Sequence, residues 1–379
     1  MEGAPAAGPR IHAKRARPAR PRDTMDYSQI QINNYNELVK LPWFDMRDDA
    51  RLKLKADAGV PPVLDFHAHL GWSYFGGRVV PYDTQHNGEA RQYYDYSKTP
   101  VNLDRDEHPF KSEADGITVD IALILMRCPP IARTQTAANL LEEMDRFNSV
   151  ATCLHPIEIP LRSRHAYQTV TTCRKYDRLI AFAGVHPWTR WKKLRLEWQL
   201  SQGAMGLKYH PEFQFSPPDT RGAMDLFALC RDRGVVVQAH SGATGTEPGW
   251  MQKLSHPDRY RKAAKEFPDL KIVLAHTAII HYEAAIAMAR EFENIYVDTS
   301  GQGVPVLQKI FKEVPRHKIL YGSDWSFFPL GVPLARSLVA LDGFPDAFKE
   351  DYLFRNACRL LGLDEQALAA GRVVRKIKH

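Results

Sequence analysis

The sequence lacks several features that would assign it to common classes of protein. Its five cysteines are scattered and include no CxxC pair. This argues against a disulfide framework or a structural zinc site and favours a reducing, cytoplasmic compartment. No apolar run reaches the roughly 18–20 residues that a membrane-spanning helix needs. The sequence alone therefore predicts no membrane partner.

Excess charge is also missing from most of the chain. The formal net charge is +7 over 379 residues, but residues 1–24 and residues 372–379 each contribute +4. Subtracting both tails leaves −1 for residues 25–371. A nearly neutral central region gives no support for a nucleic-acid partner. We expect residues 1–24, rich in Ala, Pro and Arg, to be a disordered basic tail, and residues 372–379 to be a second basic tail.

Short apolar runs punctuate the rest of the chain. Most are continuous rather than alternating, which predicts parallel strands buried on both faces. They cover residues 63–70, 119–126, 179–186, 204–210, 235–242, 271–277, 294–301 and 318–325. Helical apolar spacing lies between or after them at 134–151, 220–234, 257–267, 283–294, 332–343 and 354–363. Strand–helix units in this series predict one α/β domain over residues 25–371, a (β/α)8 TIM barrel.

One predicted connection is much longer than the others. Residues 71–118, after the first strand, are dense in aromatic side chains that include Trp72 and Tyr74. Long loops at the C-terminal face of a barrel form lids and substrate walls. We expect this insertion to do so, and a small subdomain with its own core is compatible with the same composition.

Polar side chains stand near the ends of most predicted strands. His67 and His69 are two apart in a strand, so they point to the same face. Later strands add His186, Lys208, His210, His240, His276 and Asp324. Because the C-terminal ends of barrel strands converge, we expect these groups to share one site. A His-rich site with a carboxylate suits a divalent metal, zinc first, with manganese, iron or cobalt as alternatives.

The motifs around these residues form a recognisable set. They are DFHAHLG, GLKYHP, VQAHSG, LAHTA, YVDTSG and LYGSDWSFFP, followed by FRNACRLLGL. Together, over about residues 61–363, they resemble the amidohydrolase superfamily in its amidohydrolase-related (amidohydrolase 2) branch of metal-dependent hydrolases. The resemblance implies a TIM barrel, and because barrels of this branch are often dimers, it implies a homodimer.

The resemblance also implies roles for individual residues. His67, His69, His240 and Asp324 look like metal ligands, and Asp324 also looks like the base that takes a proton from water. His276 either orients the water beside one metal or binds a second. Lys208 is either carbamylated between two metals, a free cation toward the substrate, or the partner of Asp324 in a salt bridge. One metal is favoured and two remain open. His210, His186, Trp72 and Tyr74 are the expected substrate contacts.

The reaction implied by the resemblance is hydrolysis of an amide, lactone or ester in a small organic molecule. The alternative in the same branch is a metal-dependent decarboxylase or hydratase, a lyase acting on an aromatic or enolic carboxylic acid. Arg78, Arg91, Arg127 and Arg190 are available to bind such a carboxylate. TatD-type nucleases are similar at the first strand but carry a Glu near the position of Lys208. A barrel kept as a non-catalytic binding protein is the remaining reading.

Overall fold

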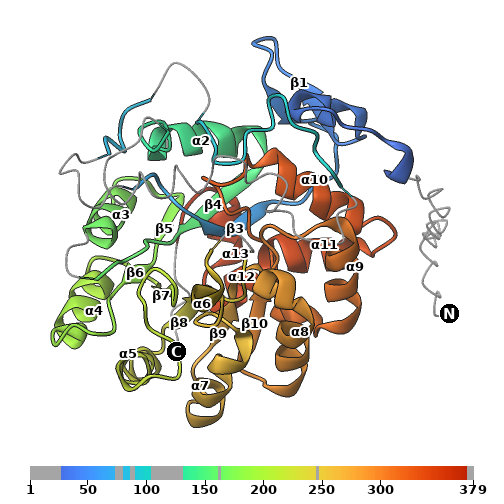
Figure 1. The fold of residues 1–379 in the computed structure, drawn as a ribbon. Helices are drawn as coiled ribbons and strands as arrows, with labels where there is room; N and C mark the ends of the chain where they lie inside the picture. Colours follow the sequence, from blue (N-terminus) through green and yellow to red (C-terminus); the bar gives the residue numbers. More distant parts are fainter. Residues whose placement is uncertain are drawn as a thin grey trace, which may run out of the picture.

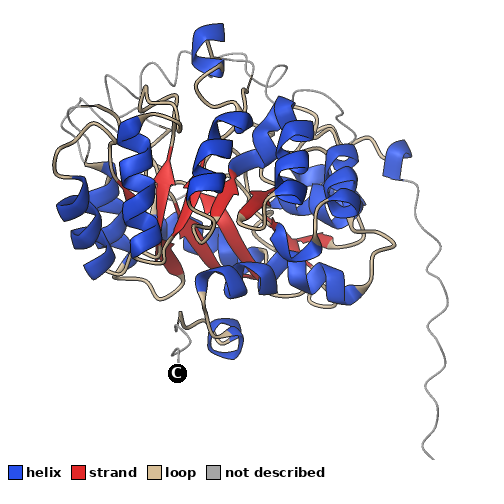
Figure 2. Ribbon diagram, turned by 90° about the horizontal axis from the view of Figure 1, so that it is seen from below, coloured by secondary structure: helices blue, strands red, loops and turns tan. Residues whose placement is uncertain are grey.

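The computed structural model describes residues 27–72, 80–85, 90–103, 131–160, 164–244 and 247–373. Most of its strands lie at the centre, with helices around them (Figures 1 and 2). The strands are β1 (Phe44–Met46), β2 (Leu52–Leu54), β3 (Val63–Ala68), β4 (Ser149–Leu154), β5 (Leu179–Ala181), β6 (Ala183–Gly184), β7 (Gly206–Tyr209), β8 (Val236–Ala239), β9 (Ile272–Leu274), β10 (Ile295–Asp298) and β11 (Ile319–Leu320).

The α-helices are α2 (Ala137–Arg146), α3 (His165–Cys173), α4 (Lys192–Ser201), α5 (Arg221–Asp232), α6 (Gly249–Gln252), α7 (Arg261–Glu266), α8 (Tyr282–Glu291), α9 (Val304–Glu313), α10 (Gly331–Ala340), α11 (Asp346–Glu350), α12 (Asn356–Leu361) and α13 (Glu365–Ala369). Short 3-10 segments are η1 (Tyr27–Gln29), η2 (Tyr35–Lys40), η3 (Pro257–Tyr260), η4 (Ala275–His281) and η5 (Arg316–Lys318), and η6 (Asp351–Arg355) is a π-helical turn. None of the helices in the described ranges is long and apolar enough to cross a membrane.

The strands from β3 onward form a closed parallel ring. One run of pairings joins β3, β4 and β5, and another joins β6 to β11 in chain order. Only Phe182 separates β5 from β6, and its amide donates to Leu154, so the two behave as one broken strand. The ring closes where Phe66 N donates to Tyr321 O at 2.9 Å and Ala68 bridges Trp325. The predicted (β/α)8 barrel is therefore confirmed, with the antiparallel β1–β2 hairpin added before it.

Most predicted elements are confirmed, but the second barrel strand is not where the sequence analysis placed it. The strand paired with β3 is β4, and its first residues fall within the helix predicted over 134–151. That helix ends early: α2 stops at Arg146, and Asn148 has a left-handed φ of 53°. Asn tolerates this conformation and ends helices there. The strand predicted at 119–126 lies outside the described residues.

The inside of the barrel changes character along the strands. Alternate residues of β8 and of the segment at β10 run from apolar to polar: Val236, Gln238 and His240, and Tyr296, Asp298 and Ser300. The apolar end packs with η6, α12 and α13 in one buried cluster. The C-terminal helices therefore close the N-terminal end of the barrel, and the polar groups gather at the other end.

Candidate metal centre

Two imidazoles and one carboxylate meet where the first and last barrel strands join. The Nε2 atoms of His67 and His69 are 3.2 Å apart. Asp324 Oδ1 lies 3.3 Å from His69 Nε2 and 3.9 Å from His67 Nε2. Ligands about 2.1 Å from a tetrahedral metal stand roughly 3.4 Å from one another. These three residues, the first donor group, are all buried and match the spacing that one divalent ion needs.

Hydrogen bonds fix the direction in which both imidazoles face. His69 Nδ1 lies 2.6 Å from the carbonyl oxygen of His155, to which it donates. His67 Nδ1 lies 3.1 Å from Asp298 Oδ2. A histidine that donates through Nδ1 keeps its Nε2 lone pair for a metal. Both lone pairs of the first donor group are thereby aimed at the same point.

Asp298 connects this group to its neighbours. Its Oδ1 accepts from His276 N at 3.1 Å and from Ser300 N at 3.0 Å, and its Oδ2 accepts from Gln238 Nε2. The YVDTSG motif contains Asp298, but the sequence alone did not predict a role for it. The position of this carboxylate at the end of a predicted strand was the signal that could have identified it. Its partner, His67, lies far away in the sequence, on the first strand of the barrel.

Burial sets the protonation of the first donor group. Burial, followed by the nearby Lys208, holds the pKa of His67 well below its usual range and lowers that of His69 to about 3. Both rings are therefore neutral at neutral pH, as metal ligation requires. Burial also raises the pKa of Asp324 to about 7, against the opposing effects of His276 and Lys208. Its Oδ1 is buried and has no hydrogen-bond partner in the described parts of the chain.

Lys208 reaches into the same space from β7. Its Nζ lies 2.9 Å from His67 Nε2, and its side chain is buried. Burial lowers its pKa to about 8, while Asp298 and Asp324 act in the opposite direction. One prediction for Lys208 was a salt bridge with Asp324. Among the ion pairs of the described residues, none joins these two side chains within 4.0 Å. A metal on His67 and the amine of Lys208 compete for the same lone pair.

His276 stands on a strained turn after β9. The residues His276, Thr277, Ala278 and Ile279 all have φ between 45° and 61°, a region that L-residues with a Cβ seldom occupy. Its Nδ1 lies 2.8 Å from Ser300 Oγ, and its ring centre is 4.8 Å from that of His67. Gly242 allows this turn to come close, because a Cβ there would lie 1.8 Å from Ala278 O. His276 thus borders the first donor group, as expected.

His240, predicted as a ligand beside His67 and His69, lies nearest to two other donors, and its ring centre is 5.1 Å from that of His276. Together with His210 and Glu212 it forms the second donor group, which is also buried. The rings of His210 and His240 stack at 3.9 Å and 8°, and His240 Nε2 lies 3.7 Å from Glu212 Oε2. Ser255 Oγ donates to Glu212 Oε1 at 2.6 Å. Burial, then the neighbouring Glu247, raises the pKa of Glu212 to about 8. The sequence analysis did not single out Glu212.

Residues 140–363 match the family model Amidohydro_2, described as Amidohydrolase. The chain belongs to this family. The match begins inside α2, so it includes Asp324 and every residue of the second donor group but stops short of His67 and His69. No curated protein matches the sequence.

Solved structures resemble the amidohydrolase barrel as a whole. An uncharacterised TIM-barrel protein from Bordetella bronchiseptica has a TM-score of 0.56 at 17% identity, covering 82% of this chain and 100% of its own. The 5-carboxyvanillate decarboxylase of Sphingomonas paucimobilis has 0.52 at 13%, covering 79% and 98%. A 2,6-dihydroxybenzoate decarboxylase bound to 2,6-dihydroxybenzoate has 0.50 at 15%, covering 80% and 99%. At these identities the likeness establishes the fold.

Aromatic rings wall one side of the first donor group in this amidohydrolase-family chain. Trp72 is buried, and its ring centre lies 5.9 Å from that of His69. Phe327 lies 6.2 Å from His69, 5.9 Å from Trp72 and 5.0 Å from Tyr93. Trp72 and Tyr93 come from the insertion predicted over 71–118, whereas Tyr74 lies outside the described residues. The parts of the insertion that are described therefore place apolar surface beside the first donor group.

Two further expectations concern His186 and the arginines. His186 Nε2 lies 3.1 Å from Gln214 O, and Nδ1 accepts from Trp188 N at 3.2 Å. Both ring nitrogens are occupied, which fits a structural role. Arg190 is exposed, and its guanidinium lies 4.5 Å from the centre of the Trp191 ring. Arg78 and Arg127 lie outside the described residues.

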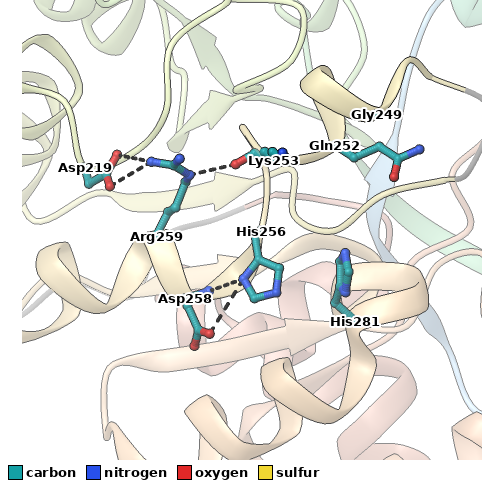
Figure 3. A pocket seen from close by; sticks show the side chains of 8 residues that line it. All are labelled: Asp219, Gly249, Gln252, Lys253, His256, Asp258, Arg259 and His281. Carbon is teal, nitrogen blue, oxygen red and sulfur yellow. Dashed lines mark hydrogen bonds and ion pairs between the residues drawn. The ribbon is translucent and has the colours of Figure 1, made fainter.

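A pocket of about 570 Å³ opens beside the loop after β8 (Figure 3). Arg259 pairs with both oxygens of Asp219 at 2.9 and 3.0 Å, and it donates to Lys253 O. The rings of His256 and His281 lie beside each other, with centres 4.6 Å apart and planes tilted by 55°. The residues that line this pocket are separate from both donor groups. Its charged lining residues include Arg259 and Asp219, which pair with each other.

Proposed function

We propose that this protein is a hydrolase that uses one divalent metal, most suitably zinc, to cleave an amide, lactone or ester in a small organic substrate. The observation that carries the proposal is the convergence of His67 Nε2, His69 Nε2 and Asp324 Oδ1 at metal-ligand spacing. A divalent ion bound there would lower the pKa of water toward neutrality and polarise a carbonyl group.

The chain's own groups supply the remaining chemistry. Asp324 is both a ligand and a carboxylate that can accept a proton from water and return it to the leaving group. Asp298 and the His155 carbonyl hold the two imidazoles in the required tautomer. His276 lies where it can orient the water or the substrate carbonyl. Trp72 and Phe327 exclude bulk water on one side, which strengthens the electrostatic interactions within the site.

Lys208 is the observation that favours a second candidate, a decarboxylase or hydratase acting on an aromatic or enolic acid. A buried amine beside the metal position can bind the carboxylate of such a substrate. Two barrels of similar fold are decarboxylases of hydroxybenzoates. If Lys208 instead carries CO2 as a carbamate, it becomes an anionic ligand, which favours two metals and hydrolysis. The fold is common to both reaction classes.

The experiment that separates these candidates begins with metal content. We expect protein purified without chelator to hold one divalent ion per chain, and the Lys208→Ala variant to keep it. Two ions, falling to one in the variant, would replace the single-metal proposal with a carbamate-bridged pair. The loaded enzyme is then assayed with lactones, esters and amides for acid release, and with hydroxybenzoates for CO2 release. Turnover of the second panel alone would reject the hydrolase.

A further inference from the structure

The outer face of α4 is unusually apolar for a surface helix. Trp191, Leu194 and Trp198, at i, i+3 and i+7, are 50%, 62% and 38% exposed. Trp188, just before the helix, is 62% exposed. The inward side of α4 buries Leu196 and Gln199. An ordinary amphipathic helix puts its apolar stripe against the core, so the large side chains of α4 point the opposite way.

The neighbouring helix extends this surface. Tyr167 of α3 is 57% exposed, and its ring stacks on that of Trp198 at 5.3 Å and 10°. The two helices lie side by side at the edge of the molecule, away from β1 (Figure 1). We call Tyr167, Trp188, Trp191, Leu194 and Trp198 the aromatic face. Contiguous exposed apolar surface of this kind marks an interaction site.

Positive charge is interleaved with the aromatic face. Residues 188–198 contain four basic residues and one acid, a net charge of +3. The acid, Glu197, is paired with Arg233, and Lys192 lies 3.9 Å from Asp225. In the described parts of the chain, Arg190, Lys193 and Arg195 form no ion pair. Their charges are therefore available to an anionic partner.

We propose that the aromatic face of α3 and α4 binds an anionic lipid surface, with α4 lying parallel to the membrane. Tryptophan and tyrosine favour the headgroup region, where a ring meets hydrocarbon and its polar edge meets water. Unpaired Lys and Arg add attraction to acidic headgroups. A helix that lies in the membrane interface does not need an apolar run long enough to span the bilayer. The proposal therefore changes the expectation of no membrane partner only for binding at the membrane surface.

Charge argues against a second copy of the chain as the occupant. In a two-fold symmetric dimer the same patch meets itself. Arg190, Lys193 and Arg195 would then oppose their own copies, and the acid available to offset them is already paired. A lipid surface supplies many negative charges and brings no positive charges together.

The position of the aromatic face also orients the barrel. The loop from β6 to α4 starts at the catalytic end of the barrel, so Trp188 and Trp191 would hold that end near the membrane. The proposal is independent of the reaction class.

The test is sedimentation of the full chain with vesicles of phosphatidylcholine alone or mixed with phosphatidylserine. We expect binding to the mixed vesicles that weakens as salt is raised. The Lys193→Ala/Arg195→Ala double variant should lower the partition coefficient about 25-fold, at about five-fold per charge. Trp191→Ser/Leu194→Ser should also reduce it strongly. Trp250→Ala, which removes an aromatic side chain of similar exposure outside this face, should leave it unchanged.

Three outcomes would overturn the proposal. Equal binding to phosphatidylcholine alone would remove the role of charge. Binding that survives both double variants would assign it to the basic tails. A change of oligomeric state in Trp191→Ser/Leu194→Ser, measured by sedimentation velocity without lipid, would assign the face to a second copy. Unchanged metal content and circular dichroism in the variants would establish that they are folded.

Discussion

The two donor groups use similar residues but are prepared differently. In the first, the remote nitrogens of His67 and His69 are anchored by Asp298 and a backbone carbonyl, and the Nε2 atoms face one point. In the second, His210 and His240 are stacked, and His240 Nε2 has no hydrogen-bond partner among the described residues. The contrast teaches that a cluster of ligand types becomes a metal site when its outer atoms are already held. We expect the second group to contact substrate instead.

The largest expected effect comes from Asp324, the carboxylate of the first group. Asp324→Asn should lower kcat about 10²–10⁴-fold, the usual contribution of a proton-transferring group, while circular dichroism stays unchanged. Asp219→Asn, which replaces a carboxylate paired with Arg259 instead, is the matched control and should retain turnover. Normal turnover in Asp324→Asn would show that the base lies elsewhere.

A second comparison tests where the metal binds. His69→Ala should remove most of the bound metal measured by elemental analysis, because it deletes one ligand of the preformed set. Glu212→Gln should leave metal content unchanged while altering KM. If Glu212→Gln instead reduces the content from two ions to one, the second donor group is itself a metal site and the contrast between the groups fails.

The smallest expected effect concerns the supports of each group. Asp298→Asn should weaken metal affinity about 10–100-fold, because it perturbs the partner of His67 Nδ1. Ser255→Ala removes the hydroxyl that donates to Glu212 and should leave metal affinity as it was. Competition with a chromophoric chelator measures both. Equal losses in the two variants would mean that the groups are coupled rather than distinct.

Much of this architecture could be predicted from the sequence, and the exceptions have physical causes. The continuous apolar runs located most of the strands, and the strand period placed His67 and His69 on one face. The strand β4 was missed because its residues continue the helical spacing of α2, and the left-handed turn at Asn148 is what separates them. The separation of His240 from the first group could not be predicted, because the strand order does not fix which neighbour an imidazole turns toward. The role of Asp298 could not be predicted either, because it depends on a contact with His67 that only the folded structure shows.

The position of the first donor group has a consequence for the chain as a whole. His67 lies on the strand that begins the barrel and His69 directly follows it, whereas Asp324 lies just after the strand that completes the barrel, across the seam where the ring closes. An ion shared by these residues would act as a clasp between the two ends of the ring. Because a clasp of this kind forms only in the closed barrel, metal supply would favour the folded chain by mass action. Loss of the metal would therefore lower the stability of the barrel as well as its activity.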